Sequence, residues 1–243
     1  MCTVTFIPSG NHFFFTSNRD EYAVRPIAVF PEQHKIGGQR LLFPLDPQGG
    51  GSWIAVHQSG NTAVLLNGAT KAHLSEPPYR KSRGLILLDI ITNNVPVKTF
   101  EDLDFDRIEP FTIILFEDKN LYSCKWNGRS KRIELLNRFM PRIWSSVTLY
   151  GPDIIIKREK WFTKWIAENP HPSAADIIRF HLQGGDGDPD NDIHMNRGGK
   201  LFTNSISCIR HSEESAAFRY LDLRSGITAN SFLSFQKTIP VKA

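Results

Sequence analysis

The second residue of the chain, Cys2, carries the clearest candidate chemistry in the sequence. Cysteine is small enough for removal of the initiator Met1 to be expected, and the mature chain would then begin with a residue that has both a thiol and a free α-amine. The reference pKa is about 7.7 to 8.0 for the α-amine and about 8.5 for the thiol, so a proton can pass between them near neutral pH. This arrangement predicts a nucleophile that carries its own base. The alternative is a small apolar side chain at the start of a strand.

A charged run, Asn18-Arg19-Asp20-Glu21, is the second candidate. A guanidinium close to a thiol lowers the pKa of that thiol, so Arg19 would activate Cys2 and hold a substrate carbonyl or carboxylate. Asp20 would accept a hydrogen bond from the α-ammonium group and fix its orientation. The alternative for this run is a solvated turn at the end of a strand.

A hairpin is needed to bring these two candidates together. Residues 2–7 alternate with a period of two, which predicts a strand, and residues 12–17 predict a second strand because they are rich in aromatic residues. Residues 8–11 have the composition of a turn. With the turn centred near Ser9 and Gly10, the register places Cys2 opposite Ser17 or Asn18. The charged run would then begin beside the first residues of the chain.

The remaining elements come in blocks of strands and blocks of helices. Helices are predicted at 82–92, at 153–168, and from a capping box at Ser173 and Asp176 to about Gly184. Strands are predicted at 53–56, 62–67, 111–116, 121–126, 132–136, 201–209 and 217–221. This order favours an α+β fold with antiparallel sheets, and the absence of a repeat or long linker predicts one domain over 1–243.

These motifs resemble the signature of the NRDE family, also called the transport and Golgi organisation family. The matching features are Met1-Cys2, Asn18 to Glu21, Arg25-Pro26, Gly50-Gly51-Ser52-Trp53, Asn67 at a strand end, and Ser82-Arg83-Gly84 at a helix start. The resemblance is specific over roughly residues 1–90 and weak beyond them. It implies the four-layer αββα sandwich of N-terminal nucleophile hydrolases, whose cysteine branch includes conjugated bile acid hydrolases and penicillin V acylases.

By position, the resemblance implies that Cys2 is the nucleophile and that Arg19 and Asp20 are its activating pair. Asn67 would offer its side-chain amide to the oxyanion, a contribution of about 3 to 4 kcal/mol where the geometry is right. The residues expected to bind substrate are Asn18, Trp53 and Asn204.

Two segments depart from the family pattern. Ile143-Trp144-Ser145-Ser146 stands where the family has Gly-Leu-Ser-Asn, so the hydroxyl of Ser146 replaces a second amide donor. Phe202-Thr203-Asn204 stands where the family has Arg-Thr-Asn and lacks the arginine. The leading expectation is a hydrolase of a non-peptide C–N amide bond in an unidentified small molecule. The departures favour the alternative, a non-catalytic ligand-binding protein on the same scaffold that handles lipid, acyl-CoA or haem.

The composition indicates the class of protein and limits the kinds of partner that we expect. Hydrophobic residues make up 40% and charged residues 22% of the 243 residues, as in a soluble globular protein. The net charge of +4 is a small excess, so we expect no nucleic-acid partner. No apolar stretch approaches the roughly 20 residues that cross a bilayer. Three scattered cysteines and no visible secretory signal predict a cytoplasmic protein, and no residue spacing predicts a metal or another cofactor.

Overall fold

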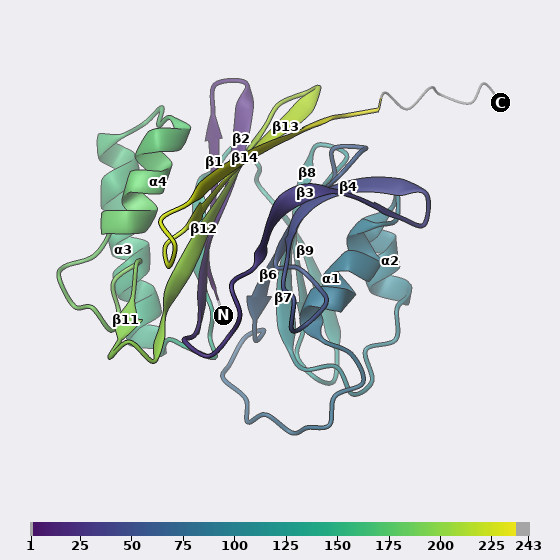
Figure 1. Ribbon diagram of the computed structural model, residues 1–243, viewed down its shortest axis with the longest axis horizontal. Helices are drawn as coiled ribbons and strands as arrows, with labels where there is room; N and C mark the ends of the chain where they lie inside the picture. The colour runs from purple at the N-terminus through teal and green to yellow at the C-terminus, as the bar shows by residue number, and fades with distance from the viewer. Residues whose placement is uncertain (1, 237–243) are drawn as a thin grey trace.

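The computed structural model describes residues 2–236, with the backbone alone at Cys2. Within this range, two antiparallel sheets lie face to face and helices cover their outer faces, which gives the four layers of an αββα sandwich (Figure 1). The α+β prediction is therefore confirmed. None of the helices in the described range combines the length and hydrophobicity that crossing a membrane requires.

The first sheet has the strand order β10-β1-β2-β12-β13-β14, with β11 paired to β12. Its strands are β1 (Cys2–Ser9), β2 (His12–Tyr22), β10 (Arg142–Ser145), β11 (Asn196–Arg197), β12 (Leu201–His211), β13 (Ser215–Asp222) and β14 (Thr228–Ser234). Helices α3 (Pro152–Glu168) and α4 (Ala174–Gln183) cover its outer face (Figure 1).

The second sheet runs in sequence order from β3 to β9. Its strands are β3 (Val29–Ile36), β4 (Gln39–Leu45), β5 (Ile54–His57), β6 (Thr62–Asn67), β7 (Phe111–Glu117), β8 (Asn120–Trp126) and β9 (Lys131–Leu136). Helices α1 (Arg83–Ile91) and α2 (Pro96–Asp102) lie on its outer side (Figure 1). The sequence patterns did not predict β3, β4, β10, β11, β14 or α2, because each of these elements is short, contains a proline or is largely polar.

Aromatic side chains join the two sheets. Phe13 and Phe15 of β2 lie with their ring centroids 5.1 and 5.7 Å from that of Phe116 on β7. A second hydrophobic cluster, which includes Phe162 and Phe180, packs α3 and α4 against the first sheet. Full burial of such a side chain stabilises the folded state by about 1.5 to 3 kcal/mol, so both pairs of layers are held by core packing.

The N-terminal hairpin is confirmed, but its predicted register was wrong. Ser9 pairs with His12, which makes Gly10 and Asn11 the turn, and Cys2 pairs with Arg19 rather than with Ser17 or Asn18. The left-handed φ of +56° at Gly10 permits this tight connection. The backbone of Cys2 therefore lies directly opposite Arg19.

Strand β2 is also longer than predicted, and it includes the whole charged run as far as Tyr22. Asn18 to Glu21 thus belong to a strand between β1 and β12 and not to a solvated turn. Side chains alternate across a strand, so Arg19 and Asp20 point to opposite faces of the sheet.

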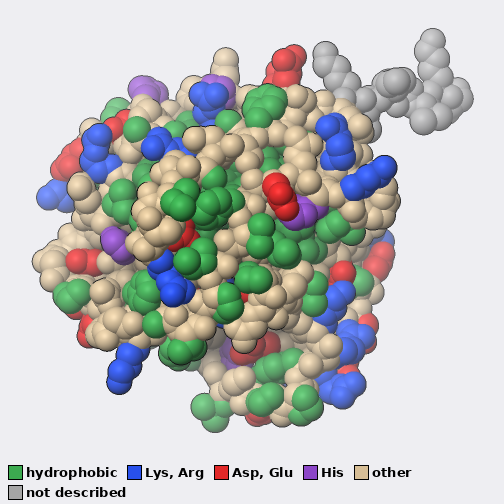
Figure 2. Space-filling model, in the orientation of Figure 1, with side chains coloured by type: hydrophobic (Ala, Val, Ile, Leu, Met, Phe, Trp, Pro, Cys, Tyr) green, Lys and Arg blue, Asp and Glu red, His purple; other side chains and the backbone are tan. Residues whose placement is uncertain are grey.

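On the surface, charged side chains are scattered among apolar and other side chains on the face shown in Figure 2.

Candidate functional site

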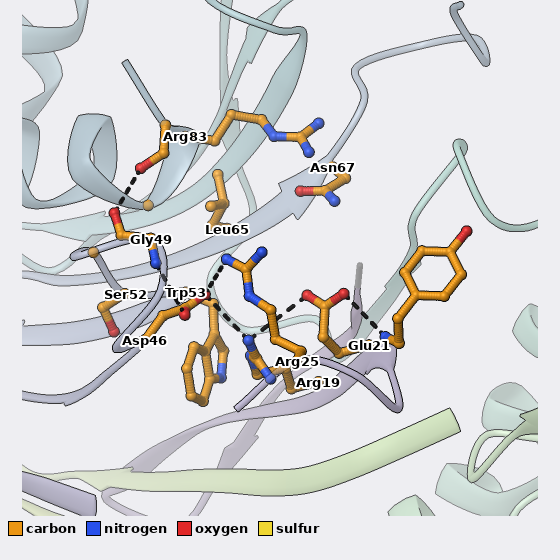
Figure 3. A pocket seen from close by; sticks show the side chains of 14 residues that line it. Arg19, Glu21, Arg25, Asp46, Gly49, Ser52, Trp53, Leu65, Asn67 and Arg83 are labelled. Atoms are coloured by element: carbon orange, nitrogen blue, oxygen red, sulfur yellow. Dashed lines mark hydrogen bonds and ion pairs between the residues drawn. The ribbon is translucent and has the colours of Figure 1, made fainter. Parts of the chain in front are cut away.

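A cavity of about 370 Å³ lies between the end of β2, the turn after β4 and the start of α1 (Figure 3). Three of the predicted site residues, Arg19, Trp53 and Asn67, line it. The complete lining is Arg19, Glu21, Tyr22, Arg25, Asp46, Gly49, Gly51, Ser52, Trp53, Leu65, Asn67, Ser82, Arg83 and Gly84. The four motifs that start at Asn18, Arg25, Gly50 and Ser82 therefore meet at one place.

Arg19 is held in the cavity wall by contacts on several sides. Its side chain is only 4% exposed, and its Nη2 lies 3.2 Å from Oδ2 of Asp46 and 3.6 Å from Oε2 of Glu21. The guanidinium carbon also lies 4.8 Å from the ring centre of Trp53. A positive charge is thus fixed next to the strand position of Cys2.

Asp46 pairs with two of the arginines that line the cavity, Arg19 and Arg25 (Figure 3). Its Oδ2 accepts hydrogen bonds from Arg19 and, at 2.6 Å, from Nη2 of Arg25, and its Oδ1 accepts from the backbone N–H groups of Gln48 and Gly49. Burial opposes ionisation of Asp46, but the hydrogen bonds from Arg25 and Gly49 and the nearby guanidinium charges outweigh it and lower the pKa of this carboxyl group. Sequence reasoning missed Asp46, since only the adjacent glycine-rich turn was a signal.

The glycine-rich turn packs directly on the start of α1. A Cβ added to Gly51 would lie 2.3 Å from the carbonyl carbon of Gly84 and 2.4 Å from the nitrogen of Leu85. Ser82 caps the helix by accepting a hydrogen bond from Leu85, and its hydroxyl donates to the carbonyl oxygen of Gly49. Close backbone approach therefore explains why a glycine pair faces a Ser-Arg-Gly helix start.

Asn67 and Ser146 are neighbours, but only Asn67 lines the cavity. The Ser146 hydroxyl donates to the backbone carbonyl of Asn67 at 2.8 Å and lies 2.9 Å from the Thr148 hydroxyl. Ser146 is buried. In this arrangement the hydroxyl proton of Ser146 is donated to another group of the protein and not to the cavity.

Asp20 faces away from the cavity, toward α3. Its carboxylate is fully buried and accepts hydrogen bonds from the hydroxyl groups of Thr203, at 2.6 Å, and Tyr150, at 3.1 Å. Burial raises the pKa of Asp20, and the hydrogen bond from Thr203 and the charge of Arg158 act against that shift. The two residues of the expected activating pair thus lie on opposite faces of the same sheet.

Asn18 and Asn204 do not line the cavity either. The Asn18 amide donates to the backbone carbonyls of His181 and Ile193, and its Oδ1 lies 2.7 Å from Nδ1 of His181, so it ties β2 to the helix layer. Asn204 is buried at a β-bulge, where the register shifts between Thr203, opposite Asp20, and Ser205, opposite Arg19. A bulge at this point bends β12 where it pairs with both charged residues.

No group of three or more potential metal-ligating side chains occurs among the residues that the structure describes. Arg83 lines the cavity and pairs with Glu109 at 2.9 Å, which places a third guanidinium in the wall. The cavity lining thus combines three guanidinium groups, the carboxylates of Glu21 and Asp46, an amide and an indole ring.

The family model described as transport and Golgi organisation 2 matches residues 1–171. No curated protein matches the chain in sequence.

Solved structures share the fold at low sequence identity. A cysteine-to-alanine mutant of the conjugated bile acid hydrolase from Clostridium perfringens aligns with a TM-score of 0.60 and 10% identity, covering 100% of this chain and 99% of the other. An arginine-to-leucine variant of that hydrolase gives a TM-score of 0.58 and 12% identity, covering 99% of each chain. The Caenorhabditis elegans ortholog of N-acylethanolamine-hydrolyzing acid amidase gives 0.59 and 10%, covering 86% and 92%.

The family match spans most of the chain, and the structural matches extend over its two sheets and their helices. The chain belongs to the transport and Golgi organisation 2 family and has the fold of the N-terminal nucleophile hydrolases.

Proposed function

We propose that this protein is a cysteine amidohydrolase that cleaves a non-peptide C–N bond in a small molecule. The Cys2 thiol gives its proton to the α-amine of the same residue, and the resulting thiolate attacks the amide carbonyl carbon. The proton then passes from the α-ammonium group to the leaving nitrogen. The C–N bond breaks and a thioester forms. Water then attacks the thioester carbon, so that amide and water give a carboxylic acid and an amine, and the thiol is restored.

One observation carries this proposal: the backbone of Cys2 pairs with Arg19, and Arg19 lines a cavity of about 370 Å³. A fixed guanidinium favours the thiolate and can hold the substrate carbonyl or a carboxylate. The structural neighbours, a conjugated bile acid hydrolase and an N-acylethanolamine-hydrolyzing acid amidase ortholog, support the same reaction class.

The other proposed roles follow the two faces of β2. Asn67, in the cavity wall, offers its amide to the developing oxyanion. Asp20, on the opposite face, holds the α-ammonium group of Cys2. Trp53 shapes the substrate pocket beside Arg19.

The first test is an intact mass of the purified protein before and after treatment with a cysteine-directed acylating probe. We expect a mass without Met1 and a single adduct on Cys2. Burial raises the pKa of the thiol to about 12 at Cys124 and to about 11 at Cys208, so neither should react in the folded protein. A retained Met1 or an unreactive Cys2 would contradict the hydrolase proposal.

Turnover is tested with a panel of N-acyl amides that includes a conjugated bile acid and an N-acylethanolamine. We expect release of amine from at least one member by the wild-type protein and none after Cys2→Ala. Cys208→Ala is the matched control, since it removes a buried thiol outside the cavity. Equal turnover by the Cys2→Ala protein would overturn the assignment of the nucleophile.

A second candidate function is ligand binding without catalysis, with lipid, acyl-CoA or haem as the class of ligand. The observation that favours it is the Ser146 hydroxyl, which donates to the carbonyl of Asn67 instead of standing free as a second oxyanion donor. Under this alternative, Cys2→Ala leaves ligand affinity unchanged and the amide panel stays intact.

A further inference from the structure

A buried polar network lies behind the first sheet, on the face opposite the cavity. Asp20 is at its centre and accepts hydrogen bonds from Thr203 of β12 and from Tyr150, which precedes α3. All three side chains are buried, with exposed fractions of 0% for Asp20, 1% for Thr203 and 3% for Tyr150. Water therefore does not compete with these contacts, and the carboxylate depends on the two hydroxyl groups for its orientation.

Arg158 connects this network to the strand that carries Cys2. Its guanidinium carbon stacks 3.6 Å from the ring centre of Tyr150, and its Nη1 donates to the hydroxyl of Thr3 at 2.5 Å. Arg158 is fully buried, and its other donors bind the backbone carbonyls of Asn191 and Asp192. A buried guanidinium that is hydrogen-bonded on every side fixes the phenol ring and the start of β1 together.

The groups that face Asp20 come from every element packed around it. Tyr150 and Arg158 approach from α3 and the segment before it, and Arg197 lies 5.4 Å from the Tyr150 ring centre on the side of β11. From α4, His181 contacts Asn18, which lies two residues before Asp20 on the same face of β2. From β1, the α-amine that the proposed function assigns to Cys2 is the remaining charged group.

His181 contributes no charge to this set. Burial lowers the pKa of His181 to about 3, so the ring is neutral at neutral pH. Both amide hydrogens of Asn18 are donated to carbonyl oxygens, so Oδ1 of Asn18 accepts from Nδ1–H of His181 and Nε2 accepts from the hydroxyl of Thr5. Besides the α-amine, the positive charge that lowers the pKa of Asp20 on this face is that of Arg158.

We propose that Tyr150 and Thr203 are positioning residues, which hold the carboxylate of Asp20 so that it orients the α-amine of Cys2, and that Arg158 braces Tyr150 against β1. This role rests on the proposed function. Both hydroxyl groups donate to the ionised form of Asp20, and burial together with the charge of Asp20 raises the pKa of Tyr150, so Tyr150 remains a donor. Loss of either donor should favour the protonated, inactive form of Asp20.

The first measurement is the titration of the Asp20 carboxyl carbon by NMR, assigned with Asp20→Asn. We expect Tyr150→Phe and Thr203→Val each to raise the pKa of Asp20 by about one unit, a tenfold change in its ionisation constant. Thr203→Ser keeps the hydroxyl and should restore the wild-type value. Tyr122→Phe, which removes a phenol hydroxyl from a half-buried side chain on β8, is the matched control.

The second measurement is the rate of Cys2 acylation as a function of pH. Because protonated Asp20 cannot hold the α-ammonium group, the acid limb of this profile should move to higher pH in Tyr150→Phe and Thr203→Val, and return in Thr203→Ser. Circular dichroism melts identify any variant that fails to fold, and the serine variant then carries the comparison.

These outcomes separate the two proposals. An unreactive wild-type Cys2 contradicts the hydrolase reaction, while the Asp20 titration still reports on the two hydroxyl donors. A reactive Cys2 whose pH profile is the same in the wild type, Tyr150→Phe and Thr203→Val overturns the positioning role. An Asp20 pKa that neither variant moves overturns it as well.

Discussion

At the scale of single residues, Arg19 combines two constraints. Backbone pairing places it opposite Cys2, and the ion pair with Asp46 sets how much of its positive charge is available there. Asp46 also binds Arg25, so one carboxylate offsets part of two positive charges. The reactivity of the proposed nucleophile should therefore respond in opposite directions to changes at Arg19 and at Asp46.

We expect Arg19→Gln to raise the pH midpoint of Cys2 acylation by about one unit, because a cation that favours the thiolate is lost. Asp46→Asn should lower the midpoint by a smaller amount, since Asn keeps the acceptor for Gln48 and Gly49 but removes the countercharge. The measurement is the acylation rate across pH, with Arg129→Gln in an exposed turn as the control for net charge. Shifts in the same direction would rule out this electrostatic model.

At the scale of elements, the cavity depends on the contact between the glycine-rich turn and α1. The carbonyl of Gly84 accepts from the N–H of Ser52 at 3.3 Å, and Ser82 binds the carbonyl of Gly49 at 3.2 Å. These contacts hold Trp53, which follows the turn, against Arg19. A side chain between the two backbones would separate them.

Gly51→Ala should destabilise the folded protein by about 1 to 3 kcal/mol, the range for overpacking a rigid contact. Its Cβ would lie 2.3 to 2.7 Å from backbone atoms of Gly84 and Leu85, which cannot rotate away. Denaturant unfolding measures the loss. Gly10→Ala is the control, because that site has open space and suffers only from its φ of +56°; an equal loss in both variants would exclude the packing explanation.

At the scale of the whole molecule, buried histidines in two different layers couple folding to pH. His181 is a residue of α4 that faces the first sheet, and burial lowers its pKa to about 3. His211 lies among Phe13, Phe116 and Phe235, and burial lowers its pKa to about 4. In the unfolded chain both rings take up a proton near the ordinary value of 6.5.

Because the unfolded state binds more protons in this window, stability should fall as the pH drops from about 6.5 toward 4, by roughly 1.4 kcal/mol per pH unit for each histidine. Above pH 6.5 this contribution is complete. We expect His181→Gln to reduce the slope by about one proton, measured by urea unfolding at about pH 7, 6 and 5. His194→Gln, at an exposed position, should leave the slope unchanged; a slope that His181→Gln also leaves intact would contradict the assignment.

The sequence by itself determined the features that depend on local physics. Residue type and position identified Cys2 as a candidate nucleophile, and the capping box of Ser173 and Asp176 was confirmed with both of its hydrogen bonds. The helix predicted at 82–92 was confirmed with Ser82 as its N-cap. Periodicity and capping act over a few residues, so they can be read without knowing what packs against them.

Only the tertiary structure decided the faces and partners of the candidate site. The run Asn18 to Glu21 looked like one functional unit, yet its place inside β2 sends Arg19 to the cavity and Asp20 to the helix layer. Tyr150 lies 130 positions from Asp20, and the two meet only because α3 folds over the first sheet. Successive side chains of a strand point to opposite faces of the sheet. Which face lines a cavity depends on the layers that cover it, and only long-range packing establishes those layers.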